Sequence, residues 1–355
     1  MNDLTSATVD RVLAAAADAT DLIAIAIGDR LGYYAALTEH GPCTDAELAG
    51  HAGTSRRYAQ EWLEQQAVAG FVEVDDSADR RFALADGVAG VMAEPEALTF
   101  LAPLARQFVA AAAQVPAIAD AARSGGGVPW SAYGPDMREA QGDLNRPGFL
   151  RLLAREWLDA LPDVRDRLAR APAARVADVG CGAGWSSIAI ARGYPLVHVD
   201  AFELDPASVR LARDNVAAEG LADRVRVHEV DIGAVATHEP YDLVMAFECV
   251  HDMPYPVQAL QAMGRLAGDR GTVLVADMKV GERFSPPGDL VERLMYGFSL
   301  SVCLPDSMSH PESAATGTAM RPDTFRQYAE LAGFAGVDTL DVDHDFWRFY
   351  RLRSC

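Results

Sequence analysis

A chain of 355 residues, half of them hydrophobic, is long enough to form two domains, each with its own core. The formal net charge of −20 argues against a large nucleic-acid interface, because such an interface needs clustered lysine and arginine. Five cysteines, at positions 43, 181, 249, 303 and 355, lack C-x-x-C spacing, so we expect free thiols in a reducing cytoplasm and no metal. The chain does not open on a signal peptide, and Asp18 and Asp21 interrupt its first apolar run, so we expect a cytoplasmic protein without a membrane span.

The first third of the chain has the pattern of a winged helix. Helical spacing is found over residues 8–38, 44–50 and 54–69, and two short strands are predicted over 71–75 and 81–84. Thr44 and Glu47 have the spacing of a capping box at a helix start. Helices joined by a short turn and followed by a β-hairpin predict a helix-turn-helix with a wing.

Two functions are open for this winged domain. Arg56 and Arg57 lie on its second short helix, where they could contact DNA. Many acidic residues surround them, which favours a dimerisation and substrate-lid module instead. The first helix carries more aliphatic residues, among them Leu13 and Ile23, than so small a domain can bury, so we expect a homodimer.

A connector follows, and it contains two aromatic residues of interest. Residues 95–122 continue as helix with proline breaks, and residues 124–135 form a glycine-rich, apolar loop. Trp130 and Tyr133 in this loop could cover a small ligand or pack at a domain interface. Helices are then expected over 147–160 and 164–169. We therefore divide the chain into domains 1–123, 124–170 and 171–355.

A glycine-rich turn organises the last of these domains. A short buried strand at 175–179 precedes Gly180, Gly182 and Gly184, and helical spacing begins at Trp185. Glycines permit positive φ and let a ligand approach the backbone closely. A dinucleotide fingerprint, G-x-G-x-x-G, would require a third glycine where Trp185 stands, which argues against a nicotinamide cofactor.

Acidic residues end the next two strands. The strand at 196–202 is followed by Glu203, about 20 positions past the glycine turn, where a carboxylate can accept ribose hydroxyls. The strand at 224–230 is followed by Asp231. Both carboxylates could instead cap their strand ends at the surface. Asp178, inside the first strand, could contact a ligand or hold the glycine turn through backbone N–H groups.

The candidate catalytic residues follow a buried strand at 242–247. Because ligands lie beyond the carboxyl ends of parallel strands, Glu248, His251 and Asp252 are expected at the mouth of the site. Histidine has an ordinary pKa suited to removing a proton from a substrate near pH 7. His251 could alternatively cap the helix that opens near Pro254.

The last part of the chain contains two further candidate ligand-binding residues, His310 and Arg321. His251 and Asp252 could bind a metal together with His310, which only C-methylation of a keto acid would need; His310 is otherwise a loop residue. Arg321 could hold an acceptor carboxylate or form an ion pair with Asp323 at a helix start. The remaining elements are predicted as strands over 271–277, 337–341 and 346–352, helices over 287–304 and 324–332, and a long loop over 305–320.

The motifs in this order resemble a known family. Asp178-x-Gly180-x-Gly182-x-Gly184, Glu203, Asp231 and the His251-Asp252 segment resemble the class I S-adenosylmethionine-dependent methyltransferases over residues 171–355. With the winged helix in front, the chain resembles actinobacterial two-domain methyltransferases, which are similar to dimeric small-molecule O-methyltransferases. The resemblance implies an α/β fold with a Rossmann-like, seven-stranded sheet behind a mainly helical domain.

The resemblance also implies a cofactor and site residues. S-adenosylmethionine would be the methyl donor and S-adenosylhomocysteine the product, with Asp231 on the adenine amine and Ile232 against the ring. His251 corresponds to the general base, with Asp252 beside it, and Met253 stands where that family often has Trp. The cofactor-binding set is then Asp178, Gly180, Gly182, Gly184, Glu203, Leu204, Asp231, Ile232, Phe247 and Glu248; the acceptor set is Trp130, Tyr133, His310 and Arg321.

The expected function is therefore methylation of a small molecule, on oxygen, with His251 as base. One alternative is C-methylation of a 2-keto acid with a metal at His251, Asp252 and His310. Another is a transcriptional regulator that senses S-adenosylmethionine and binds DNA through the winged helix. We expect a homodimer that contacts neither nucleic acid nor membrane.

Overall fold

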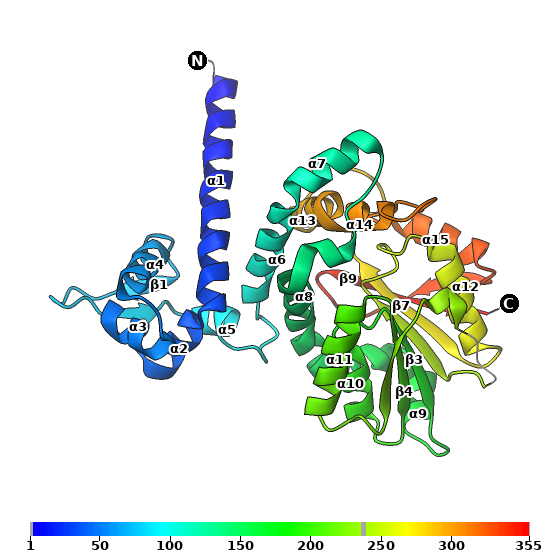
Figure 1. Ribbon diagram of the computed structural model, residues 1–355. Coiled ribbons are helices and arrows are strands. Elements are labelled where there is room, and N and C mark those ends of the chain that lie inside the picture. The colour runs from blue at the N-terminus through cyan, green and yellow to red at the C-terminus, as the bar shows by residue number, and fades with distance from the viewer. Residues whose placement is uncertain (1–2, 236–238, 355) are drawn as a thin grey trace. The chain divides into compact units, whose positions relative to one another are not determined.

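The computed structural model describes residues 3–235 and 239–354, and the chain forms two compact units, Met1–Ala110 and Ala111–Cys355 (Figure 1). The division between the two units falls within helix α6 (Ala102–Ala113), and the domain bounds 1–123, 124–170 and 171–355 stay a prediction. Among the described residues, no helix is long and apolar enough to cross a membrane. Cys355 lies outside the described residues, and the other four cysteines are free thiols.

The first unit has the predicted helices and wing. Its elements are α1 (Asp3–Arg30), α2 (Tyr33–His40), α3 (Asp45–Ala52), α4 (Arg56–Val68), β1 (Val72–Val74), β2 (Phe82–Leu84), α5 (Val88–Met92) and the start of α6. The predicted capping box forms at the start of α3, where Thr44 and Glu47 bond to each other's backbone N–H groups. β1 and β2 pair antiparallel, with Val72 opposite Leu84.

The two arginines considered for DNA contact are both paired with carboxylates. Arg56 Nε lies 2.9 Å from Asp45 Oδ2, and Arg57 forms an ion pair with Glu61 one helical turn further on. A guanidinium that is already paired is less available to phosphate. These contacts give no support to a nucleic-acid interface on α4.

The second unit is built around one sheet. Its strands are β3 (Arg175–Val179), β4 (His198–Glu203), β5 (Val225–Glu229), β6 (Leu243–Phe247), β7 (Thr272–Met278), β8 (Gly336–Thr339) and β9 (Trp347–Arg353). Its helices are α7 (Val115–Ser124), α8 (Gly134–Gly148), α9 (Pro162–Leu168), α10 (Trp185–Gly193), α11 (Pro206–Ala218), α12 (Pro256–Ala267), α13 (Leu290–Phe298), α14 (Leu304–Met308) and α15 (Pro322–Leu331).

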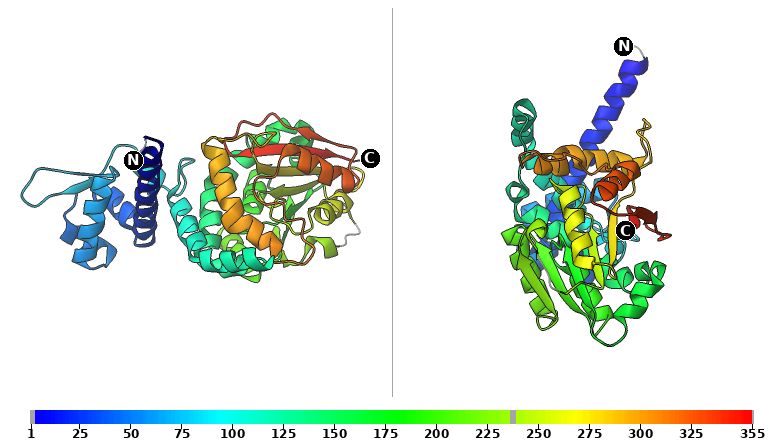
Figure 2. Two further views of the ribbon diagram at one scale, coloured as in Figure 1. Left: turned by 90° about the horizontal axis from the view of Figure 1, so that it is seen from above. Right: turned by 90° about the vertical axis from the view of Figure 1, so that its right-hand side faces the viewer.

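The seven strands have the order β5-β4-β3-β6-β7-β9-β8. The first five are parallel, and β9 runs antiparallel between β7 and β8. Helices α10 and α11 lie on one side of this sheet and α12 on the other, as Figure 1 shows and Figure 2 repeats from two further directions. This arrangement confirms the predicted α/β fold with a seven-stranded, Rossmann-like sheet.

The central strands are apolar at nearly every position because both faces of the sheet are covered. Successive residues of β6 alternate between two cores: Leu243 packs with the cluster that includes α10, and Val244 with the cluster that includes α12 and α15. β3 alternates in the same way between Val176 and Ala177. A parallel sheet buried on both faces therefore reads as a continuous hydrophobic run.

One helix was predicted in the wrong place. Residues 124–135 were expected to be loop and 147–160 helix, but the helix is α8, which begins at Gly134 and ends at Gly148. Its first turn contains Pro135, whose missing N–H costs nothing at a helix start. After Pro147 the regular helix gives way to a π turn (Phe149–Leu153) and a 3-10 turn (Trp157–Ala160).

The segment before β8 also differs from the prediction. The helix expected over 287–304 begins later, at α13, where the Asp289 side chain accepts a hydrogen bond from Glu292 N at 2.8 Å. A π turn (Ser299–Cys303) and α14 then continue the helical path, so the expected loop at 305–320 starts only after Met308. This brings Cys303 and Asp306 onto an ordered helical segment.

An aromatic cluster at the start of β9 depends on a neutral histidine. The His344 ring stacks on Trp347, with centroids 4.8 Å apart and planes 10° from parallel. Its Nδ1 accepts hydrogen bonds from the backbone N–H groups of Phe346 and Trp347 at 3.1 and 2.9 Å. Burial lowers the pKa of His344 to about 4, because the charged ring would be poorly solvated there.

Acid should therefore weaken the fold through His344. A folded-state pKa below the unfolded value of about 6.5 means that the full contribution to stability is present above pH ~6.5 and declines as the pH falls toward 4. The free energy of unfolding from urea melts, measured across this range, should fall more steeply for the wild type than for His344→Asn. Parallel curves for the two proteins would contradict this account.

Candidate active site

The glycine-rich turn lies between β3 and α10, at the carboxyl edge of the sheet. Gly180, Gly182 and Gly184 have φ values of +68°, +52° and +81°, which L side chains rarely adopt. A Cβ on Gly180 would lie 2.9 Å from the Cys249 sulfur, whereas a Cβ on Gly182 would meet no atom within 4 Å. Gly180 therefore permits close packing within the protein, and Gly182 keeps space open above the turn.

Glu203 ends β4 with its carboxylate facing this turn. Oε2 accepts a hydrogen bond from Gly182 N at 2.9 Å, and Oε1 accepts from the N–H groups of Leu204 and Asp205 at 2.8 and 2.9 Å. Burial raises the pKa of Glu203, while these three N–H groups oppose that rise. A carboxylate has about four lone-pair positions, so this one can accept a further hydroxyl.

Asp178 binds two serine side chains at the start of α10. Its Oδ2 accepts hydrogen bonds from the Ser186 and Ser187 hydroxyls, both at 2.6 Å, and its side chain is buried. Burial raises the pKa of Asp178 to about 6, although the two hydroxyls oppose this. The residue thus ties β3 to the first turn of α10.

The other expected cofactor residues differ in exposure. Asp231 is exposed, and its Oδ1 accepts a hydrogen bond from Gly233 N at 2.8 Å, the contact expected of a cap. Ile232 is buried against the core that contains Phe202. Leu204 is exposed beside Glu203, and the Phe247 ring packs edge-on against Phe149 with centroids 5.2 Å apart. The chain just beyond the ends of β4 and β5 therefore carries Leu204, Asp231 and Ile232. Phe247 belongs to the core.

Glu248 is held in a strained conformation by helix α8. Its φ of +54° is uncommon for a residue other than glycine and tends to occur at functional sites. Its Oε2 accepts hydrogen bonds from Gln141 Nε2 at 2.9 Å and Asn145 Nδ2 at 2.7 Å. Burial raises the pKa of Glu248 to about 7. The sequence did not reveal these two amide contacts, because no helix was predicted over residues 136–146, which form most of α8.

The side chain of His251 is buried between two carboxylates. Its Nδ1 lies 2.5 Å from Asp277 Oδ1, and its backbone N donates to Asp277 Oδ2 at 3.2 Å. Its Nε2 lies 3.0 Å from Asp252 Oδ1, and that oxygen receives no hydrogen bond. Burial alone would lower the pKa of His251, but Asp252 and Asp277 outweigh it and raise the pKa well above the ordinary value.

Asp277 was not among the predicted site residues. It stands near the end of β7, the strand beside β6, and its side chain is almost fully buried. A carboxylate inside an otherwise apolar parallel strand is itself a signal, because such a group is rarely buried without a partner. The sequence contained this signal but could not name His251 as the partner.

The predicted aromatic loop packs on the segment that contains Cys303. Val128 N donates to Pro305 O at 2.8 Å, Trp130 N to Asp306 Oδ1 at 2.7 Å, and the Tyr133 hydroxyl to Ser301 O at 2.8 Å. Burial raises the pKa of Asp306 to about 7, and the negative charge of Asp252 adds to the effect. Tyr133 and Asp306 therefore lie near the His251–Asp252 end of the site.

Two predicted acceptor residues have other contacts. Arg321 pairs with Glu292 and also donates to Gly281 O at 2.7 Å and to the Tyr296 hydroxyl at 3.0 Å. Asp323, its expected partner, pairs instead with Arg326. His310 is half-buried, and it is not part of the described cluster of possible metal ligands at His251.

The residues present fit S-adenosylmethionine on structural grounds. The open space at Gly182 and the acceptor capacity of Glu203 lie together at the carboxyl edge of β3 and β4. Glu203 would hold the ribose hydroxyls, and the glycine turn would lie against the amino-acid part of the cofactor. The strained Glu248 lies further along the same edge.

Comparison with protein families agrees with this site. Residues 171–309 match the family model of a methyltransferase domain, and residues 19–93 match the model of an Rv2258c-like winged helix-turn-helix domain. The chain therefore contains a methyltransferase domain behind a winged helix-turn-helix domain, the two kinds of domain that the sequence predicted.

Solved structures share the fold along the whole chain. Mitomycin 7-O-methyltransferase has a TM-score of 0.69 at 19% identity, with 99% of both chains covered. Human N-acetylserotonin methyltransferase, in complex with S-adenosylmethionine, has a TM-score of 0.66 at 16% identity, covering 100% of this chain and 98% of that one. An O-methyltransferase family protein from Burkholderia thailandensis has a TM-score of 0.68 at 17% identity, with 98% of both chains covered. The fold is thus that of small-molecule O-methyltransferases.

Curated relatives match only one part of the chain. A tRNA1(Val) (adenine(37)-N6)-methyltransferase of Yersinia pestis is 40% identical over 77 residues, which are 21% of this chain and 31% of that protein. The chain therefore spans about a third of the length of the curated relatives it matches. This likeness carries no conclusion about the acceptor.

Replacing the Glu203 carboxylate should weaken cofactor binding. Glu203→Gln removes a charged hydrogen-bond acceptor, whose loss typically costs about 1.5–3 kcal/mol, or roughly 10- to 150-fold in affinity. Titration calorimetry with S-adenosylmethionine and S-adenosylhomocysteine measures the change. Glu229→Gln is the matched control, because Glu229 pairs with Glu203 across β4 and β5 but is exposed. Equal affinities for both variants would refute this role.

Proposed function

We propose that this methyltransferase transfers the methyl group of S-adenosylmethionine to an oxygen atom of a small molecule, with His251 as the general base. The observation that carries the proposal is the buried pair of His251 and Asp277, joined at 2.5 Å at the ends of β6 and β7. The likeness to small-molecule O-methyltransferases over the whole chain supports the choice of acceptor class.

Methyl transfer to a hydroxyl oxygen requires that the oxygen lose its proton. S-adenosylmethionine supplies an electrophilic methyl group on a sulfonium sulfur, so the task of the protein is to orient the acceptor and take its proton. Nδ1 of His251 is committed to Asp277, which leaves Nε2 to receive the proton. The proton passes from the acceptor hydroxyl to Nε2, and the ring becomes an imidazolium.

The neighbouring carboxylates favour this proton transfer. Asp252 and Asp277 raise the pKa of His251, because both stabilise the positively charged ring. Asp277 also fixes the ring orientation through two hydrogen bonds, one to the ring and one to the backbone of His251. We therefore assign Asp277 as a positioning residue and Asp252 as a second source of electrostatic stabilisation.

The aromatic loop and the α14 segment would exclude water from the acceptor. Tyr133 is buried, and its hydroxyl bonds to the π turn that carries Cys303. Gly127 approaches the same segment so closely that a Cβ there would lie 2.1 Å from Ser309 N. This close packing supports a role for Trp130 and Tyr133 as a cover over a small acceptor. Arg321 has no part in the proposal, since its guanidinium is engaged by Glu292.

We further propose that the chain acts as a homodimer through α1. This helix exposes a row of aliphatic side chains at helical spacing, namely Val9, Val12, Leu13, Ile23 and Ile27. Val12 and Leu13 are each 63% exposed. Exposing several neighbouring apolar side chains to water costs free energy. A second copy of the chain would bury them.

The dimer proposal can be tested by charge substitution on α1. The double variant Val9→Glu/Leu13→Glu places two carboxylates in the apolar row and should shift the mass, measured by light scattering after gel filtration, from twice to once the 38.0 kDa of the chain. Asp10→Glu, a conservative change on an exposed neighbouring position, is the control. A wild type that runs as a monomer at micromolar concentration would refute the proposal.

Removing the base should abolish most of the activity while leaving the cofactor bound. With isotope-labelled S-adenosylmethionine and a panel of phenols, keto acids and amines, we expect label in a hydroxylated acceptor. His251→Gln should lower kcat by about 10²- to 10⁴-fold, the usual contribution of a general base. Asp277→Asn should lower kcat as well, with little change in the affinity for S-adenosylhomocysteine.

The matched control is a second histidine–aspartate pair of the same sheet. His228 Nε2 lies 2.7 Å from Asp200 Oδ1, outside the proposed acceptor site, so His228→Gln should keep wild-type turnover. Full turnover by His251→Gln would remove the base assignment. Label found only on a carbon atom of a keto acid would favour the C-methylation alternative.

A further inference from the structure

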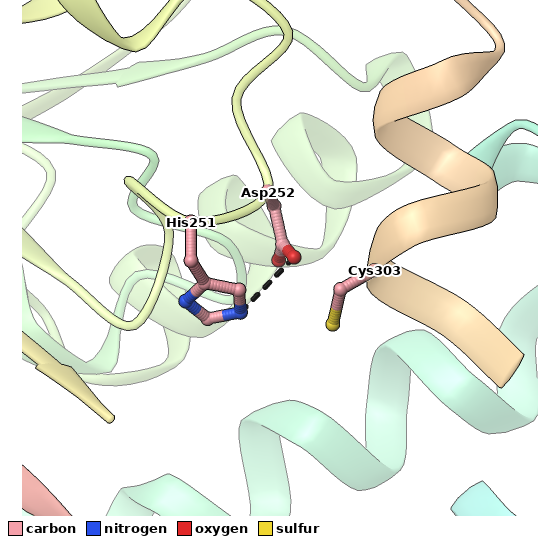
Figure 3. A group of neighbouring side chains, drawn as sticks. All are labelled: His251, Asp252 and Cys303. Atoms are coloured by element: carbon pink, nitrogen blue, oxygen red, sulfur yellow. Dashed lines mark ion pairs between the residues drawn. The ribbon is translucent and has the colours of Figure 1, made fainter. Parts of the chain in front are cut away.

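Three side chains of different chemistry meet beside the proposed acceptor. His251 and Asp252 follow β6, and Cys303 ends the π turn before α14, about fifty residues later in the chain (Figure 3). Nε2 or Nδ1 of the histidine, a carboxylate oxygen and the sulfur all lie within 4.8 Å of one another. Imidazole, carboxylate and thiolate are the three ligand types that Zn²⁺ takes in proteins.

The imidazole is already arranged as a metal-binding histidine. His251 Nδ1 lies 2.5 Å from Asp277 Oδ1. The opposite ring nitrogen, Nε2, lies on the side of Asp252 and Cys303 (Figure 3). A carboxylate on the far nitrogen is the usual outer-shell partner of a metal-bound histidine. A cation that binds Nε2 would displace any proton held there.

One buried oxygen atom in this region is not satisfied by a hydrogen bond. Asp252 Oδ1 is buried and accepts no hydrogen bond of good geometry, although His251 Nε2 lies 3.0 Å away. The hydroxyl of the buried Thr318 lies beside the Cys303 thiol. Buried polar atoms without partners are costly, and a missing ion or water is one established reason for them.

We propose that His251 Nε2, the Asp252 carboxylate and Cys303 Sγ bind a thiophilic divalent cation of the Zn²⁺ class, and that this cation inhibits methyl transfer. On binding, the Cys303 thiol releases its proton to solvent, as does any protonated Nε2 of His251, and three metal–ligand bonds form. Three protein ligands leave a fourth tetrahedral position for water. Small movements of the side chains, of about 1 Å, bring the three ligand atoms to metal-bonding distance.

The inhibition rests on the proposed function, whereas the binding does not. Nε2 of His251 is the atom that would take the acceptor proton, and a nitrogen bound to a metal has no lone pair left for that role. Zinc should therefore slow turnover by occupying His251 Nε2. A higher concentration of S-adenosylmethionine should not relieve this inhibition. Cys303 has no role in the proposed proton transfer, so its removal separates metal binding from catalysis.

Cobalt titration of the metal-stripped, full-length protein tests the site directly. Co²⁺ should bind at one per chain with a thiolate-to-cobalt charge-transfer band, and Zn²⁺ should displace it. Cys303→Ser should lose the band and at least about 10-fold in affinity, while Cys43→Ser, which alters a buried cysteine of the first unit, should behave as wild type. No band in the wild type, or an equal band in Cys303→Ser, would overturn the proposal.

Turnover measured beside the titration tests the inhibition. Measured against its own metal-free rate, Cys303→Ser should require at least about 10-fold more Zn²⁺ than the wild type for half-inhibition, in line with the expected loss of affinity. Wild-type turnover that is unchanged or faster when the site is saturated with Zn²⁺ would overturn the inhibitory role. A cobalt band without methyl transfer to any acceptor would uphold the metal site while refuting the proposed function.

Discussion

The hydrogen bond between His251 and Asp277 is the contact on which the candidate site depends. It joins the carboxyl ends of two neighbouring parallel strands, whose register sets Phe247 opposite Ala276 and so brings the following residues side by side. Both oxygens of Asp277 are used, one by the ring and the Met278 N–H, the other by the His251 N–H. The ring therefore has one orientation, with Nε2 toward Asp252. A ring nitrogen so fixed can take a proton from an acceptor or bind a cation, but not both at once. Proton transfer and metal binding at His251 therefore cannot occur at the same time.

Helix α8 connects this end of the site with the cofactor end. Its Gln141 and Asn145 hold the strained Glu248, and its Arg138 donates to Asp205 at 2.8 Å, two residues beyond Glu203. Gly142 lets the helix approach the glycine turn, because a Cβ there would lie 2.7 Å from that of Ala183. One helix thus contacts the ends of β4 and β6 and the turn after β3. The positive φ of Glu248 persists because these contacts determine its position.

The features that the sequence predicted well are local ones. The glycine turn, the strand that leads into it and the Glu203 carboxylate lie within a short stretch of chain, where the pattern of residues dictates the backbone. Both faces of the sheet are covered, so the strands appear as apolar runs that are easy to recognise. The prediction failed at α8, because a loop was expected up to residue 135 and a helix only from residue 147, whereas Pro135 lies in the first turn of α8 and Pro147 one residue before its end. Asp178 was left undecided, and its two serine contacts are those of a structural residue.

The sequence by itself determined the two kinds of domain and their order, the glycine-rich turn and the position of His251 directly after a strand, because each follows from residues adjacent in the chain. Only the tertiary structure decided which groups meet that histidine. Asp277 reaches it through the pairing of β6 with β7, and Cys303 through a helical segment about fifty residues away, whereas His310, which the sequence offered only as an alternative metal ligand, lies outside the cluster. Spacing along the chain cannot identify such partners, because contacts between distant residues are set by how strands and helices pack.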